Sequence, residues 1–423
     1  MNVFLIGNGF DLHYDLPTSY TCFLKVMQYL CVKLEAKESI TSVFRILNDE
    51  KLKEIEIIKR CCERYGAKYD AVIDSQELHS IVTAMSTNMW FAYLSACVEL
   101  NGGWVDFERE IGRVIDTIAV FLDSLVYKDD LVRFKTNGDP TSVSVWGVCV
   151  YFPVFFDKSI VTEDYRWVNI PMRYVDPKYK EEMPPLSRKF VINKKRIALE
   201  LFESLRELSR ALSFYLRYFV DYPVQYIAEH DDNFGDVFFH TKRWSKAYVV
   251  SFNYTHTLEY ITKRWLEVKT SLPISYIHGE LGKNEIVLGV NSDEKDEHDE
   301  MELSFLNFKK YYQRVYFETD ASYVKLISVI RNDFSLKGYT VFVIGHSLDV
   351  TDSEVIIDCF MNAGRIIVFN YNMNESEKHI RNLITIFGKK EFDKLRLEKR
   401  LSFVPLDEMK LSAQDFAKKY LEA

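Results

Sequence analysis

Residues that interrupt regular structure are scarce in this chain. It has 423 residues but only 10 prolines and 16 glycines, which excludes collagen-like repeats and long flexible linkers. No apolar run reaches the roughly 20 residues that a membrane-spanning helix needs. The most apolar stretch, residues 145–156, is short and contains Pro153. With 48% hydrophobic and 27% charged residues, the composition is that of a globular protein.

Paired cysteines are also missing. The seven cysteines are scattered and form no C-x-x-C motif, so the sequence contains neither a zinc ribbon nor a disulfide framework. Reduced thiols are typical of a cytoplasmic protein. The N-terminus has no basic region and reaches Asp11 too early for a signal peptide. We therefore expect a cytoplasmic protein that does not contact a membrane.

Several catalytic motifs are absent as well. The sequence has no G-x-x-x-x-G-K-[ST] loop, no G-x-S-x-G elbow and no H-E-x-x-H helix. The net charge of -8 argues against broad, charge-driven binding of nucleic acid. An acidic run at residues 292–300 lacks the glycine and the spacing of a calcium loop. We interpret it as a solvated loop and expect no metal.

Apolar residues recur at three- and four-residue steps in the first third, which predicts helices at residues 19–34, 39–64, 78–100 and 104–125. A further helix is predicted at residues 196–222. The pattern changes between residues 126 and 189, where six of the ten prolines fall among alternating apolar stretches such as VSVWGVCVYF. We interpret this segment as an inserted, partly β module.

The last third alternates short apolar runs with helical patterns. The runs predict strands at residues 248–252, 273–277, 286–290, 341–344 and 365–370, in addition to a strand before Gly7. Short apolar strands separated by helices are typical of a doubly wound parallel sheet. We therefore predict an α/β, Rossmann-like fold in which the N-terminus and the last third form the sheet. The predicted segments are residues 1–125, 126–195 and 196–423.

The sharpest local feature is the turn Gly7-Asn8-Gly9, which is followed by Phe10 and Asp11. Glycines at the end of a strand let the backbone approach a phosphate or a ribose closely, and the next helix could present its amides to an anion. The third glycine of the dinucleotide fingerprint is missing, so a plain strand-to-helix turn is an equal alternative. Asp11 could likewise cap the first helix or contact a ligand.

Pro17 and Thr18 extend this feature. Pro17 completes a G-x-G-x7-P pattern like the one that opens sirtuin-like nucleotide-binding folds. The whole segment, IGNGFDLHYDLPTSYTCFL, resembles the start of the AbiH family of bacterial abortive-infection, phage-defence proteins. The resemblance implies a sirtuin-like sheet that binds NAD or a related nucleotide. It places the residues from Gly7 to Asp11, together with Pro17 and Thr18, in the nucleotide pocket.

Three later segments and Asn370 fit the same resemblance, and each follows or ends a predicted strand. SFNYTHTLE contains Asn253 and Thr255, YIHGE contains His278, and VIGHSLDVTD is similar to a stretch that borders the nucleotide in sirtuin-like domains. Doubly wound sheets bind ligands at the carboxyl ends of their strands. The resemblance therefore adds these residues to the predicted pocket: Thr255, Gly345, His346, Ser347, Asp349 and Asn370.

The resemblance implies that Asn253 and His278 are the catalytic pair, as in sirtuin-like NAD hydrolases. Cleavage of the nicotinamide–ribose bond passes through an oxocarbenium-like state, in which an amide can orient sugar and water without adding charge. A histidine can hold or relay a proton near neutral pH. Structural roles stay open: Asn253 could cap the following helix, and His278 could bond a buried carbonyl. His346 stands where a tyrosine is common and is more often structural than catalytic.

The stretch WVDFE also resembles an AbiH-family element and contains Trp104, Asp106 and Glu108. These residues could reach the pocket, or the two acids could simply lie at the start of a helix. The leading hypothesis is an NAD(P)-hydrolase-like N-glycosidase with a small-molecule nucleotide as its partner. A phage-derived trigger and a homo-oligomer are further expectations. The alternatives are a nucleotide-sensing toxin or regulator without catalysis, and a nuclease that uses Asp106 and Glu108 with magnesium.

Overall fold

The structure is a computed structural model that describes residues 2–36, 41–100, 105–123, 126–128, 131–135, 152, 159–161, 165–168, 174, 193–244, 247–263, 265, 272–283, 285–290, 304–332 and 338–421. The chain divides into two compact units. One contains Met1–Ile81, Leu212–Val287 and Arg314–Ala423, and the other contains Val82–Ala211 and Leu288–Gln313. The predicted division at residues 125 and 195 stays a prediction.

Six parallel strands form the sheet of the first unit. They are β1 (Asn2–Ile6), β6 (Ala247–Ser251), β7 (Ile274–Tyr276), β8 (Thr340–Ile344), β9 (Arg365–Asn370) and β10 (Leu401–Pro405). Their spatial order is β10-β9-β8-β1-β6-β7, and β1 pairs with both β6 and β8. Numbered in chain order, this is the 3-2-1-4-5-6 order of a Rossmann fold. The predicted α/β fold, with a parallel sheet built from the N-terminus and the last third, is confirmed.

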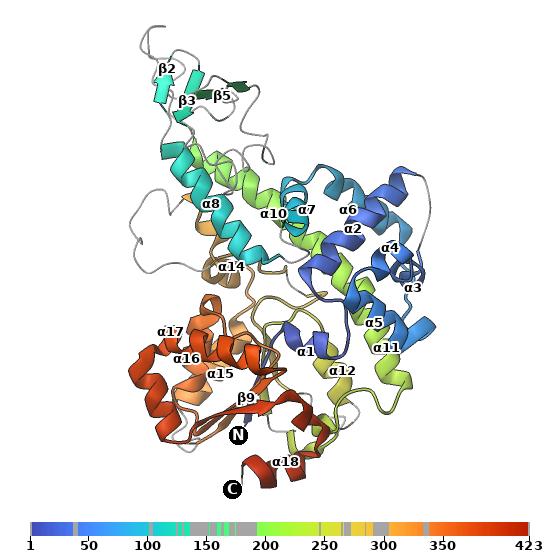
Figure 1. Cartoon of the computed structure of the whole chain (residues 1–423), viewed down its shortest axis with the longest axis vertical. Coiled ribbons are helices and arrows are strands. Elements are labelled where there is room, and N and C mark those ends of the chain that lie inside the picture. The colour runs from blue at the N-terminus through green and yellow to red at the C-terminus, as the bar shows by residue number, and fades with distance from the viewer. Residues whose placement is uncertain are drawn as a thin grey trace. The chain divides into compact units, whose positions relative to one another are not determined.

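Both faces of this sheet are covered, because alternate residues of each strand point to opposite sides. Val3 and Leu5 belong to a core shared with α15 (Ala321–Asn332), α16 (Ser353–Phe360) and α17 (Met373–Leu397). Figure 1 shows these three helices grouped beside β9. On the other face, Phe4 packs against the rings of Trp244 and Phe342. Two buried faces explain why the strands appear in the sequence as nearly continuous apolar runs.

Helices make up most of the other residues that the structure describes. The remaining helices of the first unit are α1 (Asn8–His13), α2 (Tyr20–Glu35), α3 (Val43–Leu47), α4 (Glu50–Lys53), α5 (Glu56–Tyr65), α11 (Tyr222–His230), α12 (Thr257–Lys263) and α18 (Ala413–Tyr420). Two helices, α6 (Ser75–Thr87) and α14 (Lys310–Tyr316), contain residues of both units. The second unit contains α7 (Met89–Leu100), α8 (Phe107–Asp123) and most of α10 (Lys194–Leu216). It also contains the antiparallel strands β2 (Val126–Lys128), β3 (Leu131–Lys135), β5 (Tyr165–Val168) and β4 (Ser159–Val161), in that spatial order.

Two predicted helices are divided by polar residues. The helix predicted at residues 39–64 is wrong as a single element, because Ser42 and Asp49 accept backbone N–H bonds and begin α3 and α4. The helix predicted at residues 78–100 breaks at Asn88, whose Oδ1 accepts the N–H of Phe91 at the start of α7. No single helix in the described ranges is long and apolar enough to cross a membrane. The pair α6 and α7 passes that test only together, and the two are bent by 75°.

The strand predicted at residues 286–290 is also wrong. Only Val290 makes an isolated bridge, to Lys309. A side chain takes the place of a neighbouring strand, because Gln313 accepts the N–H of Leu288 and donates to its carbonyl. The acidic run at residues 292–300 and most of residues 126–192 lie outside the described residues.

Candidate functional site

The polar residues picked out by the motifs lie at one edge of the six-stranded sheet. Because all six strands are parallel, their carboxyl ends share this edge. The buried polar residues that follow or end a strand there are Asp11 after β1, Asn253 and Thr255 after β6, His278 after β7, His346 after β8 and Asn370 at the end of β9. The strand order reverses between β1 and β8, which is where Rossmann-like sheets bind ligands.

The glycine turn after β1 packs directly against the loop after β8. The N–H of Gly9 donates to the carbonyl of Gly345 over 2.8 Å, and the N–H of Gly7 donates to Ile344 over 3.1 Å. A Cβ on Gly9 would lie 2.8 Å from the Cα of Gly345, which itself has a φ of +67°. The glycines thus allow two backbones to touch, and both amides already bond to carbonyls of the protein.

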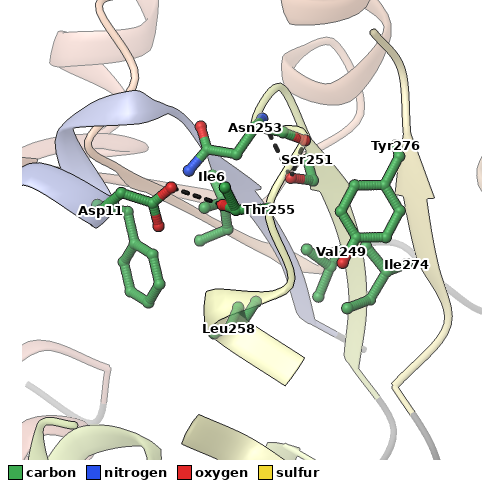
Figure 2. A pocket seen from close by; sticks show the side chains of 10 residues that line it. Ile6, Asp11, Val249, Ser251, Asn253, Thr255, Leu258, Ile274 and Tyr276 are labelled. Atoms are coloured by element: carbon green, nitrogen blue, oxygen red, sulfur yellow. Dashed lines mark hydrogen bonds between the residues drawn. The ribbon is translucent and has the colours of Figure 1, made fainter. Parts of the chain in front are cut away.

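Asp11, Asn253 and Thr255 line a small cavity beside this turn (Figure 2). The cavity has about the size of a single water molecule. It is bounded by α1, β1, β6, β7 and the start of α12, and its lining residues are Ile6, Phe10, Asp11, Val249, Ser251, Asn253, Thr255, Leu258, Ile274 and Tyr276. His278, Gly345, His346, Ser347, Asp349 and Asn370 do not line it.

Asp11 is a buried acid beside this cavity. The hydroxyl of Thr255 donates to its Oδ2 over 2.6 Å, whereas its buried Oδ1 has no hydrogen-bond partner among the described residues. Burial raises the pKa of the Asp11 carboxyl to about 7, although the bond from Thr255 acts in the opposite direction. Gly7 occupies the N-cap of α1 and no side chain caps that helix, so the alternative that Asp11 is a helix cap is wrong.

Asn253 lies next to Asp11. Its backbone N–H donates to Ser251 Oγ over 3.2 Å, and that hydroxyl donates back to the Asn253 carbonyl. Figure 2 shows the side-chain amide beside the Asp11–Thr255 pair. The buried Oδ1 has no hydrogen-bond partner in the described part of the chain, so Asn253 does not cap α12. A carboxyl that titrates near neutral pH and an unsatisfied amide can together orient and deprotonate a bound water.

A second group forms around Asp352. Its Oδ1 lies 3.3 Å from Nε2 of His278, and its Oδ2 lies 3.4 Å from Nε2 of His346. The N–H of Leu348 donates to Nδ1 of His346, so a neutral His346 carries its proton on Nε2, facing Asp352. The ring of Phe252 packs against both histidines. His278 and His346 are thus brought together, but by an acid that sequence analysis did not single out.

Asn370 is engaged by a neighbouring histidine. Its Oδ1 lies 2.6 Å from Nδ1 of His379, whose Nε2 lies 3.0 Å from the carbonyl of His346. Burial lowers the pKa of His379 to about 4, so the ring is neutral at neutral pH. The ring of His379 therefore lies between Asn370 and the loop after β8.

Several other predicted pocket residues make hydrogen bonds within the protein, either through a capping side chain or through a backbone carbonyl. Asp349 Oδ1 accepts the N–H of Thr351, and the carbonyl of Ser347 accepts from Asn382 Nδ2. The carbonyl of Pro17 accepts the hydroxyl of Tyr215. Thr18 is different, because its buried Oγ1 has no hydrogen-bond partner among the residues that the structure describes.

The sequence did not predict a charged cluster of Asp221, His256 and Glu280 near the start of α12. Asp221 ends a π-helical turn (Arg217–Asp221) and is buried. Its Oδ2 lies 2.5 Å from Nδ1 of His256, whose Nε2 lies 3.3 Å from Oε1 of Glu280. Burial lowers the pKa of His256, but the Asp221 carboxylate outweighs it and raises that pKa to about 9. His256 and Glu280 lie inside the quoted motifs, whereas no sequence signal pointed to Asp221.

Residues 3–371 match the family model described as bacteriophage abortive infection AbiH. This chain belongs to the AbiH family. No curated protein and no solved structure matches it. The family assigns it a role in abortive infection, a defence against bacteriophage. The match ends directly after β9 and so includes every motif residue described above.

The WVDFE element of this AbiH-family chain lies in the second unit, and Trp104 is outside the described residues. Asp106 Oδ1 accepts the N–H of Arg109 and so caps α8. Glu108 Oε2 lies 2.8 Å from Nζ of the buried Lys310. Both acids have structural partners within their own unit, and their contact with a nucleotide stays a prediction.

Proposed function

We propose that this AbiH-family protein is a hydrolase that cleaves the N-glycosidic bond of NAD or a related nucleotide. The pairing of Asp11 with Asn253 carries the proposal. Both side chains are buried, Asp11 in the helix that follows β1 and Asn253 in the loop that follows the adjacent strand β6. Each has one oxygen without a hydrogen-bond partner among the described residues. An unsatisfied buried oxygen costs about 1–3 kcal/mol, and such a group calls for an explanation such as a catalytic role.

The proposed reaction is a hydrolysis in which water forms a bond to C1′ of the ribose while the bond from C1′ to the nicotinamide nitrogen breaks. The bonding pair stays on the nitrogen, which loses its positive charge, so nicotinamide leaves without needing a proton. The ribose passes through an oxocarbenium-like state. The Asp11 carboxylate stabilises that positive charge and accepts the proton from the attacking water, a role suited to its pKa of about 7.

The surrounding groups would supply orientation. The uncharged amide of Asn253 holds the water against the sugar, and the cavity is the right size for that water. His278, held near Asp352, bonds a ribose hydroxyl. The nucleotide lies along the carboxyl edge of the sheet, outside the cavity, as the Rossmann strand order favours. This placement is the sirtuin-like part of the proposal, and a phage-derived trigger would switch the activity on.

Mass spectrometry of nucleotides tests the proposal. NAD and NADP are measured with purified protein, and in cells with and without phage infection. We expect wild type to deplete at least one of them. Asp11→Asn and Asn253→Ala should each lower the rate about 100-fold or more. Asn374→Ala, at an exposed position, is the matched control and should leave the rate unchanged.

The alternatives give different results. Intact NAD and NADP in infected, growth-arrested cells that make wild-type protein would sink the hydrolase proposal. Nucleotide binding and growth arrest that both survive Asn253→Ala and His278→Ala would instead indicate a nucleotide-sensing regulator. Metal-dependent cleavage of RNA or DNA that disappears in Asp106→Ala would indicate the nuclease. Thermal unfolding of each variant confirms that it is folded.

A further inference from the structure

We infer that His256, Glu259 and Glu280 form a binding site for one divalent cation that accepts mixed nitrogen and oxygen ligands, such as Mn²⁺ or Zn²⁺. One potential ligand atom of each residue lies within 4.8 Å of the other two. The residues come from the start of α12 and from the loop after β7. Sequence analysis expects no metal, and this inference does not depend on the hydrolase proposal.

Asp221 orients the histidine for such a role. Its Oδ2 lies 2.5 Å from Nδ1 of His256, and its Oδ1 accepts the backbone N–H of the same residue over 2.9 Å. This fixes the ring so that Nε2 faces Glu280. A carboxylate on the far nitrogen of a metal-binding histidine is the usual arrangement in metal centres. The π-helical turn that positions Asp221 is a distortion often found at functional sites.

The two glutamates are also held in place. The hydroxyl of Tyr276 donates to Glu259 Oε1 over 2.9 Å. Glu280 Oε1 lies 2.6 Å from Nζ of Lys283, whose side chain is 69% exposed while that of Glu280 is 17% exposed. The Lys283 ammonium thus lies beside the ligand atom of Glu280. Because the lysine side chain is exposed, it can move into solvent when a cation binds. His256, Glu259 and Glu280 are all partly exposed, so a cation can reach them.

The donor set narrows the choice of cation. Imidazole suits zinc and other transition metals, and carboxylates suit manganese and magnesium. One imidazole nitrogen with two carboxylates therefore favours Mn²⁺ or Zn²⁺ over Ca²⁺, which prefers six to eight oxygens. If the site binds no cation, the same geometry is explained by a protonated His256 between the carboxylates of Asp221 and Glu280. Metal-binding measurements distinguish these two explanations.

The test uses the full chain after removal of metal with EDTA. Mn²⁺ binding is followed by electron paramagnetic resonance and Zn²⁺ binding by calorimetry, with Mg²⁺ for comparison. We expect one Mn²⁺ or Zn²⁺ per chain. Glu280→Gln should weaken binding at least about 10-fold, and Asp221→Asn about 10- to 100-fold. Glu354→Gln, which changes an exposed glutamate paired with Arg314, should have no effect.

Lys283→Ala should strengthen cation binding, whereas the other variants weaken it or leave it unchanged. It removes the ammonium that competes for Glu280, so binding should tighten about threefold, and its exposed position does not endanger folding. Absence of stoichiometric Mn²⁺ or Zn²⁺ would overturn the inference, as would equal binding by wild type and Glu280→Gln. Weaker binding in Lys283→Ala would also contradict it. Loss of NAD is not a readout here, so this result and that of the hydrolase test are independent.

Discussion

Burial decides the chemistry of Asp11. Its side chain is 1% exposed, and loss of water favours the neutral acid, which raises the pKa from 3.8 to about 7. Between these two pH values the folded chain binds a proton that the unfolded chain does not. The contribution of Asp11 to the free energy of unfolding is therefore largest below about pH 4, and it is lost as the pH rises through about 7.

Asp11→Asn should remove this dependence, because an amide has no proton to lose. Relative to wild type, the variant should gain up to about 4 kcal/mol in the free energy of unfolding between pH 4 and pH 8. Urea unfolding at pH 4, 5, 6, 7 and 8 measures the gain. The control is Asp231→Asn, at an exposed position, and its curve should parallel that of wild type. Parallel curves for Asp11→Asn and wild type would contradict the burial argument.

Sequence identified several residues of the candidate site but not their partners. Asn253, His278 and His346 follow apolar runs, and parallel strands bring such positions to one edge, so their shared location was predictable. Asp352 stood within a quoted motif, yet nothing in the pattern shows that it lies between two histidines. Asp221 lies within the helix predicted at residues 196–222, and only the π-helical turn directs it toward His256.

Elements were predictable where burial is uniform. Strands with two buried faces stand out as apolar runs, which is why β1, β6, β8 and β9 were found. β10 was missed because only Leu401 and Val404 of its residues are buried and it ends in Pro405. Residues 286–290 have the composition of a strand, but composition does not tell whether a strand or a side chain satisfies the backbone. In the structure the partner of Leu288 is the side chain of Gln313, whereas Val287 and Val290 bond backbone groups outside any strand.

Gln313→Ala should therefore lower the free energy of unfolding. Gln313 is 2% exposed and bonds both backbone groups of Leu288 as well as the carbonyl of Asn307. Unsatisfied buried backbone groups cost about 1–3 kcal/mol each, so the free energy of unfolding should fall by about 2–4 kcal/mol. Gln225→Ala, which removes a partly exposed glutamine that bonds only Glu229 among the described residues, should change it by less than about 0.5 kcal/mol. Urea unfolding compares the two, and equal losses would refute the assignment.

The whole fold extends beyond the family match. That match ends at residue 371, but β10 pairs in parallel with β9. Leu383, Phe392 and Leu395 of α17 belong to the same core as β1 and β8. On the opposite face, Phe416 of α18 packs against Phe238 and Phe369. Residues 372–421 therefore help to cover both faces of the six-stranded sheet.

Two truncations test this conclusion. Removal of residues 411–423 takes away Phe416 and should give a folded but weaker protein, by about 3–5 kcal/mol. Removal of residues 372–423 also uncovers the edge of β9 and the core under α17, and should give an insoluble or protease-sensitive chain. Circular dichroism and limited proteolysis measure both. A truncation at residue 371 that unfolds as cooperatively as wild type would show that the matched region folds alone.

The central position of β1 has a consequence for synthesis on the ribosome. Its neighbours are β6 and β8, so Asn2–Ile6 has no strand to pair with until residues 247–251 have emerged. At translation rates of roughly 5–20 residues per second, that delay is on the order of 10–50 s. During this interval the unpaired apolar segment is prone to aggregation. The Asp11–Asn253 pair cannot exist on a nascent chain before then, which delays any toxicity that depends on it.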